Sequence, residues 1–156
     1  NFAIPMAHYY LGDPIHAACG EVEMLKVFGL AKSWEFPDAS PYTCKLVMWL
    51  RLVGIPYELI YVPWPEMIER APRKSVPWVE DSDGEVVHDS KRAISRLTEK
   101  YDIRLDAELS QKQLAQSRAW QRLLEDHYYW AVLVYMRWVD DENWEIYKQE
   151  LAASIE

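Results

Sequence analysis

The sequence is poor in cysteine. Its 156 residues include only Cys19 and Cys44, which form neither a Cys-x-x-Cys pair nor a zinc-ligand spacing. A disulfide framework is therefore excluded, and a reducing, cytoplasmic setting agrees best with this composition. His8 and His16 lie near Cys19, but the spacing of the three is irregular. We therefore assign no metal site.

Long apolar runs and positive charge are also lacking. No uncharged apolar stretch reaches the roughly 18 residues of a membrane-spanning helix. The net charge of −8 at pH 7 argues against nucleic acid as a main partner, because phosphate binding draws on clustered lysine and arginine. Residues 1–23 have neither the basic segment nor the apolar core of a secretory signal. We interpret them as an extension or a non-native leader.

Apolar and aromatic residues, by contrast, are plentiful. Half of the residues are hydrophobic, and the chain holds eight tryptophans and ten tyrosines. The aromatic residues are concentrated between Trp120 and Tyr147. Large aromatic side chains dominate cores and interfaces, so we expect this cluster to pack against a substantial surface. The length suits one ordinary domain, or one small domain with part of another.

A strand-helix-strand unit is predicted in the first half of the chain. Residues 25–30 form an apolar run typical of a strand, residues 41–53 carry an apolar face of helical period, and residues 57–62 indicate a second strand. Gly54 is a stop signal for the helix. Because the connections are short, we expect parallel strands joined by a right-handed crossover.

A hairpin and a second helix are predicted next. Residues 63–65 interrupt the pattern with two prolines, and residues 66–70 suit a short helical turn. The runs 76–80 and 85–88 flank the turn sequence Asp-Ser-Asp-Gly, which indicates an antiparallel hairpin. Asp89 is a natural N-cap for the helix that follows.

The remainder of the chain is predicted to be helical. Residues 110–113 form a capping box, and apolar positions continue from there to Trp138 in one long helix. Asp140 and Asp141 are expected to break this helix and to cap a final one.

The junction between the first strand and the first helix carries Ser40 and Pro41. Serine is a good N-cap, and proline suits the first helical position because its missing N–H would have no helical partner there. A helix N-terminus also favours a thiolate or another anion. On these residues alone, a simple helix cap is the favoured interpretation and a binding site is the alternative.

The predicted order β-α-β-α-β-β-α, followed by helices, resembles glutathione transferases, which join a thioredoxin-like domain to a helical one. The segment 40–45, Ser-Pro-Tyr-Thr-Cys-Lys, resembles the Cys-Pro-Tyr/Phe start of glutaredoxins and omega-type transferases, with serine in place of cysteine. Val76-Pro77 resembles the family's Val-Pro step, whose proline is cis, and Asp89-Ser90 resembles the acidic-Ser pair that begins its third helix. One subgroup is similar in the combination of segments 37–42 (Pro-Asp-Ala-Ser-Pro-Tyr), 74–81 (Lys-Ser-Val-Pro-Trp-Val-Glu-Asp), 89–90 (Asp-Ser) and 124–130 (Leu-Glu-Asp-His-Tyr-Tyr-Trp). It comprises the bacterial transferase-like proteins related to metaxins and to the failed-axon-connections protein.

The resemblance implies an α/β fold with a thioredoxin-like, glutathione-binding domain at 24–102. It also implies a partial, truncated all-helical domain at 103–156. Val76 would pair its backbone with the cysteinyl unit of glutathione, as in strand addition, next to a cis bond at Pro77. Asp89 would pair with the γ-glutamyl ammonium, and Ser90 would hold its carboxylate. An ordinary strand start and an ordinary N-cap pair remain alternatives for these positions.

The remaining roles concern the two ends of the ligand. Arg73 and Lys74 would bind the glycyl carboxylate, although a solvated basic loop explains them equally well. Ser40 takes the catalytic position by resemblance and would donate a hydrogen bond to the thiolate, with Tyr42 as a second candidate donor. Because residue 40 is not cysteine, disulfide exchange at that position is not expected.

We therefore predict a glutathione transferase that uses glutathione as co-substrate and attacks a small-molecule electrophile with its thiolate. The alternative is a metaxin-like protein-interaction module without catalysis, since a fold does not determine function. A shortened helical domain would leave aromatic surface uncovered, so we expect a homodimer or a higher homo-oligomer.

Overall fold

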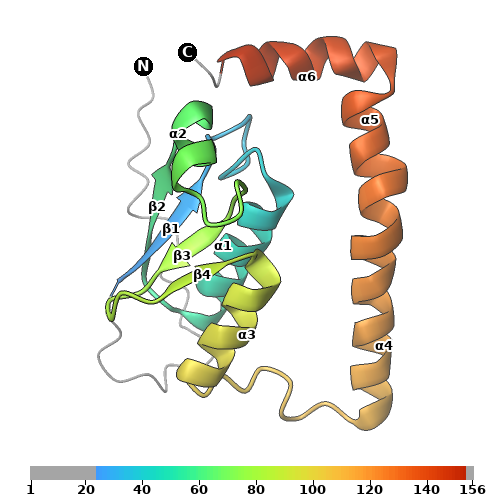
Figure 1. Cartoon of the computed structure of the whole chain (residues 1–156). Helices are drawn as coiled ribbons and strands as arrows, with labels where there is room; N and C mark the ends of the chain where they lie inside the picture. Colours follow the sequence, from blue (N-terminus) through green and yellow to red (C-terminus); the bar gives the residue numbers. More distant parts are fainter. Residues whose placement is uncertain (1–23, 154–156) are drawn as a thin grey trace. The chain divides into compact units, whose positions relative to one another are not determined.

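The structure, a computed structural model, describes residues 24–153. Residues 1–23, interpreted above as an extension or leader, lie outside this range. The chain divides into two compact units, with the boundary between Ile103 and Arg104. Figure 1 shows the first unit as strands and helices together and the second as helices alone.

A four-stranded sheet forms the centre of the first unit (Figure 1). Its strands are β1 (Leu25–Gly29), β2 (Tyr57–Tyr61), β3 (Trp78–Glu80) and β4 (Val86–His88). The order across the sheet is β2-β1-β3-β4, with β1 parallel to β2 and the other two pairs antiparallel. This is the thioredoxin-like arrangement, so the predicted fold class is confirmed, including the parallel crossover and the hairpin.

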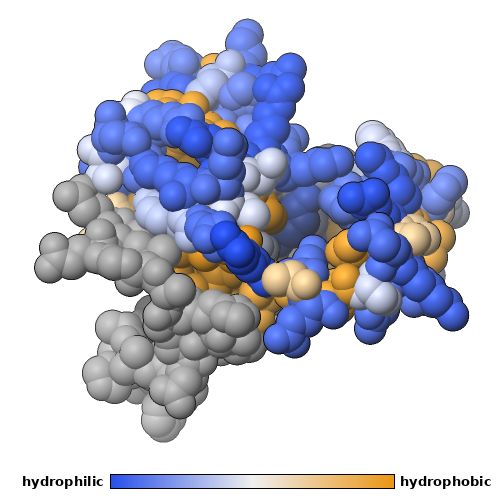
Figure 2. All heavy atoms as spheres, turned by 90° about the horizontal axis from the view of Figure 1, so that it is seen from below, coloured by the Kyte–Doolittle hydropathy of each residue, from blue (hydrophilic) through white to orange (hydrophobic). Residues whose placement is uncertain are grey.

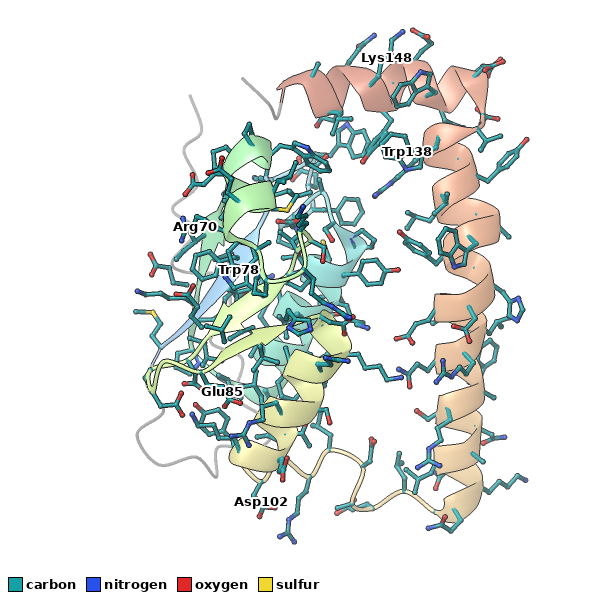
Figure 3. The ribbon with its side chains drawn as sticks, in the orientation of Figure 1. Arg70, Trp78, Glu85, Asp102, Trp138 and Lys148 are labelled. Atoms are coloured by element: carbon teal, nitrogen blue, oxygen red, sulfur yellow. The ribbon has the colours of Figure 1, made fainter. Side chains whose placement is uncertain are left out.

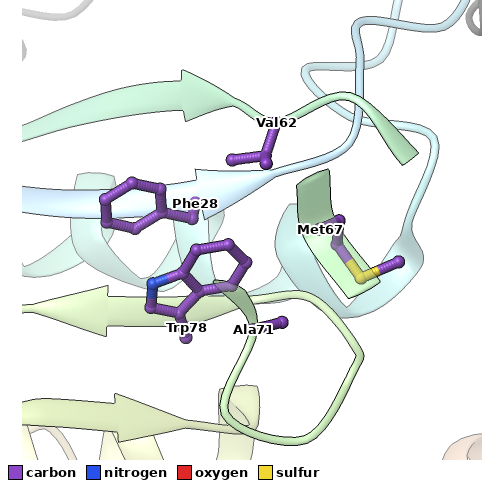
Figure 4. Close-up of a cluster of buried hydrophobic side chains, with 5 residues drawn as sticks. All are labelled: Phe28, Val62, Met67, Ala71 and Trp78. Carbon is purple, nitrogen blue, oxygen red and sulfur yellow. The ribbon is translucent and has the colours of Figure 1, made fainter. Parts of the chain in front are cut away.

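Three helices complete this unit: α1 (Pro41–Val53), α2 (Trp64–Arg70) and α3 (Ser90–Lys100). Helices α1 and α3 pack against each other. Successive side chains of a strand point to opposite faces, so β1 directs Val27 to one face and Phe28 to the other. Phe28 and Trp78 stack with 4.5 Å between their ring centroids, and they join Met67 of α2 in a buried cluster (Figure 4). Helix α2 therefore covers this face.

Helix α2 begins earlier than the sequence indicated. The prolines of residues 63–65 were expected to precede the helix, yet α2 starts at Trp64 and includes Pro65 in its first turn. Proline is tolerated there because the first N–H groups of a helix have no partner within it. The prediction of a break at this place was wrong by about one half-turn.

The second unit holds the helices α4 (Gln111–Arg122), α5 (Tyr135–Trp138) and α6 (Asp141–Ala153), with a π-helical segment η1 (Leu123–Val134) between α4 and α5. Ser110 forms the predicted capping box with Gln113. The expectation of one regular helix is corrected, because twelve residues in its middle are π-helical. A π-helix bonds i to i+5 and so turns less per residue, and an apolar stripe spaced for an α-helix is not kept on one side.

Few side chains of the second unit are buried. Trp138, Trp144 and Tyr147 pack together around the α5–α6 turn, with ring centroids 5.2 to 6.4 Å apart. Asp140 accepts the backbone N–H of Asn143 at 3.0 Å and so caps α6, as predicted. Apolar side chains reach the surface among hydrophilic ones (Figure 2). Within residues 24–153, no helix has the length and hydropathy needed to cross a membrane.

Candidate functional site

The segments predicted to hold the site meet at one end of the sheet. The register pairs Phe28 with Trp78 and Trp78 with His88. Phe28, one residue before the end of β1, therefore lies beside the first residue of β3 and the last residue of β4. In Figure 3, Trp78 marks this end, while Glu85 lies by the hairpin turn at the other end. The chain before α1, the Val-Pro step before β3 and the start of α3 all come from this end.

Ser40 is the N-cap of α1, as the sequence predicted. Its backbone is extended, and its Oγ accepts the N–H of Thr43 at 3.5 Å, a long hydrogen bond. Pro41 follows at the first helical position. The Ser40 side chain is largely buried, with 8% of the residue exposed, whereas Tyr42 is 38% exposed. Lys45 lies over the Tyr42 ring, with its ammonium 6.0 Å from the ring centroid.

Asp38 is a buried residue that sequence reasoning missed. Its Oδ1 accepts the N–H of Ser40 at 2.7 Å, and its Oδ2 accepts the N–H of Leu30 at 2.8 Å. Only 2% of the residue is exposed. Burial raises the pKa of this carboxyl from 3.8 to about 6, although the backbone N–H groups of Ser40 and Leu30 oppose that rise.

Two sequence signals could have pointed to Asp38. An aspartate two residues before a helix cap often bonds the backbone two residues on, as an Asx-turn. Gly29, at the end of β1, is the second signal. A Cβ at Gly29 would overlap the Asp38 carboxyl, lying against its Oδ2 and 3.1 Å from its Cγ. The glycine therefore leaves the space that the carboxyl fills.

The cis bond between Val76 and Pro77 is confirmed. Val76 is half-buried, and Pro77 is buried just before β3. The Pro77 carbonyl accepts the N–H of Asp89 at 3.1 Å, so this bond joins the Val-Pro step to the start of α3.

The cap of α3 is also as predicted. Asp89 has a positive φ of 72° and accepts the N–H groups of Lys91 and Arg92, at 2.8 and 3.2 Å, through its Oδ1. The side chain is exposed, whereas Ser90 is 2% exposed. Asp89 is thus open to a ligand, and the Ser90 hydroxyl is covered.

The basic pair lies in the loop between α2 and β3. Arg73 and Lys74 are both exposed, and Lys74 has a positive φ of 54°. The Lys74 N–H donates to the Ala71 carbonyl at 3.0 Å, which fixes the turn before Val76. Within residues 24–153, no group of three or more His, Cys, Asp or Glu side chains is arranged to hold a metal ion.

The sequence is similar to proteins of one family. The sequence model of the glutathione S-transferase N-terminal domain matches residues 41–143. The chain is 40% identical over 124 residues to an isoprene-epoxide–glutathione S-transferase of Rhodococcus sp. (strain AD45), covering 80% of this chain and 52% of that protein. It is 30% identical over 141 residues to Failed axon connections of Drosophila melanogaster, covering 90% of this chain and 33% of that protein.

The fold has solved counterparts. A glutathione S-transferase of Ceriporiopsis subvermispora, solved in complex with glutathione, superposes with a TM-score of 0.54 at 15% identity, covering 85% of this chain and 61% of that one. The chain spans about half the length of the Rhodococcus relative and about one third of the length of the Drosophila relative. The extent of the domain match and the thioredoxin-like sheet together show that the chain belongs to the glutathione S-transferase superfamily.

Proposed function

We propose that the protein binds glutathione at the end of the sheet where α1 and α3 begin, and promotes attack of its thiolate on an electrophile. The observation that carries the proposal is the convergence of three motifs, Ser40, Val76-Pro77 and Asp89, on that one end. The 40% identity to an epoxide-conjugating glutathione transferase supports it. Isoprene epoxide is accordingly the first electrophile to test.

Each role follows from the local chemistry. The half-buried Val76 precedes β3 and would offer its backbone to the cysteinyl unit, in the manner of an added strand, beside the cis bond to Pro77. Asp89 is exposed, so its carboxylate would pair with the γ-glutamyl ammonium. The covered Ser90 would act through its place at the start of α3, where N–H groups favour a carboxylate.

The other end of the ligand would meet the basic loop and the α1 start. Arg73 and Lys74 would bind the glycyl carboxylate, since both are exposed in the loop before Val76. Ser40 would donate a hydrogen bond from its hydroxyl to the thiolate at the N-terminus of α1, with the helix dipole adding to the effect. Tyr42 remains a second candidate donor.

Calorimetry with glutathione tests this function. The wild type should bind at millimolar glutathione, Asp89→Asn should bind more weakly, and Ser40→Ala should bind but conjugate isoprene epoxide more slowly. Asp106→Asn is the matched control, because this exposed carboxylate lies outside the site. Absence of binding by the wild type would refute the proposal, and unchanged turnover in Ser40→Ala would refute the role of Ser40 alone.

A second candidate is a non-enzymatic, metaxin-like interaction module. The similarity to Failed axon connections favours it, as do the exposed aromatic side chains of the second unit, which include Trp120, Trp130 and Tyr135. Both candidates are compatible with a cytoplasmic protein that forms homo-oligomers. Size-exclusion chromatography with light scattering tests the oligomer, and a monomer at micromolar concentration would contradict it.

We also propose a division of labour between residues 24–102 and residues 103–156. The first segment would bind glutathione, and the second, a helical domain, would supply contacts to a partner. This division predicts that glutathione affinity is insensitive to surface substitutions in α6, such as Glu142→Gln at an exposed position.

A further inference from the structure

Asp38 lies at the centre of the loop that leads from β1 to Ser40. The carboxyl connects the backbone of Leu30, just after β1, with the backbone of Ser40, just before α1. Its own main-chain carbonyl accepts a hydrogen bond from the thiol of Cys44, with 3.1 Å between sulfur and oxygen. One residue thus contacts the start, the end and the helical continuation of the loop.

The neighbouring residues reinforce this arrangement. The Tyr61 hydroxyl donates to the Pro37 carbonyl at 2.6 Å, and the Ala39 N–H donates to the Ala31 carbonyl at 2.8 Å. Tyr61 of β2 and Cys44 of α1 face the loop from the neighbouring elements, and Tyr57 and Arg51 interact with Tyr61 in turn. The Asp38 carboxylate accepts the N–H groups of Ser40 and Leu30, and among the described residues no cation is a cause of its pKa shift.

A carboxyl group is suited to this place in a way that an amide is not. The two N–H groups bond to two different oxygens of Asp38. Asparagine has one acceptor oxygen and would turn its NH₂ group toward one of these donors. Helix capping does not need Asp38, because the Ser40 side chain already accepts the N–H of Thr43. An ionisable group buried where neither a cation nor a cap requires it is typical of a functional site.

We propose that Asp38 is a positioning residue for Ser40: it holds the Ser40 backbone so that the hydroxyl reaches the thiol of bound glutathione. This inference rests on the proposed function. Asp38 itself touches no ligand. Its effect on the thiol passes through Ser40. Replacing either residue should therefore raise the thiol pKa by the same amount, and replacing both should raise it little further.

The test separates ligand binding from thiol ionisation. S-Methylglutathione binding, measured by calorimetry, reports the site without an ionisable thiol. Ultraviolet absorbance of the thiolate, followed against pH in the glutathione complex, reports the thiol pKa. For Asp38→Asn we expect S-methylglutathione affinity within about twofold of the wild type and a thiolate fraction at neutral pH about tenfold lower, which corresponds to one charged hydrogen bond.

Controls make the outcome specific. Asp81 is another buried carboxyl, and it accepts the backbone N–H of Ser82 at the hairpin turn. Asp81→Asn is therefore the control and should leave the thiol titration unchanged. The pair Asp38→Asn and Ser40→Ala should show no additive effect. If Asp38→Asn does not fold, the same thiol titration is carried out on Asp38→Ser. Serine needs less room and keeps one hydrogen-bond acceptor.

Two results would overturn different claims. If the wild type binds neither glutathione nor its S-methyl derivative, the proposed function fails and this inference fails with it. If the wild type binds but Asp38→Asn titrates like the wild type, the proposed function stands and the positioning role is refuted. A shift in Asp81→Asn equal to that in Asp38→Asn would refute it too, because general destabilisation would then be the cause.

Discussion

The contact between Gly29 and Asp38 makes a quantitative prediction for Gly29→Ala. The added methyl group would overlap Asp38 Oδ2 and would also lie 3.2 Å from the Thr43 Cγ2. Oδ2 is the atom that accepts the Leu30 N–H, so the carboxyl can move aside only by giving up that hydrogen bond.

The magnitude follows from three contributions. Overpacking in a tight core destabilises by about 1–3 kcal/mol. Leaving a buried N–H without its acceptor adds about 1–3 kcal/mol. Replacing glycine in a strand returns about 0.4–1 kcal/mol through the unfolded chain. We therefore expect Gly29→Ala to lower the free energy of unfolding by about 3 kcal/mol, the middle of the range of roughly 1–5.6 kcal/mol that these contributions span.

A double-mutant cycle with Asp38→Ala tests the reasoning. Truncation at position 38 removes the atoms that the new methyl group meets, so the same Gly29→Ala change should destabilise that background by only about 1 kcal/mol or less. Urea unfolding of the four variants, followed by tryptophan fluorescence and circular dichroism, measures the coupling. Additive effects within about 0.5 kcal/mol would refute the contact as the cause.

Three further predictions concern stability. Because the folded state raises the pKa of Asp38, the protonated carboxyl stabilises the fold fully below pH 3.8, and this stabilisation is lost as the pH rises to about 6. Over that interval the free energy of unfolding of the wild type should fall by about 3 kcal/mol relative to that of Asp38→Asn. Urea unfolding at several pH values measures this, and parallel pH profiles of the two free energies would contradict it. Lys100→Met removes the ion pair with the buried Asp81, at 2.8 Å, and should lower the free energy of unfolding by about 1–3 kcal/mol, as measured by urea unfolding. An unchanged urea midpoint would show that the pair contributes nothing to stability. Trp78→Ala removes the stacked partner of Phe28 and should destabilise by about 3–5 kcal/mol in thermal unfolding; a loss below 1 kcal/mol would mean that the cluster collapses around the gap.

Much of the first unit could be predicted because its signals are local. Ser40 and Asp89 cap their helices through side-chain bonds to backbone groups two or three residues away. Gly54 ends α1 with a left-handed backbone, φ 74°. The parallel β1–β2 pair and the β3–β4 hairpin could be predicted from the short connections and the turn sequence, whereas the pairing of β1 with β3 was implied only by the resemblance to a known fold. The cis bond at Pro77 could be anticipated only through the resemblance to a known family, since a strand-start proline is equally compatible with a trans bond.

The second unit could be predicted less well, for a physical reason. An α-helical stripe is recognised when apolar residues recur on one side, but Leu123–Val134 carries apolar residues on most positions. Such a segment does not specify which side is buried, and none of its residues is buried in the structure. The capping box at Ser110 and the cap at Asp140 gave the ends of this region, whereas the winding between them had no local signal.

The position of Asp38 shows where local reasoning ends within the candidate site. By sequence, Asp38 stands among Pro37, Ala39 and Ser40, in a composition typical of an exposed turn. It is buried because β1 ends in a residue without a side chain, and that residue, Gly29, is nine positions earlier in the chain. Neither residue is informative alone. A pairing of a strand-end glycine with an aspartate just before a helix cap is therefore the pattern to seek when a buried carboxyl at this junction is in question.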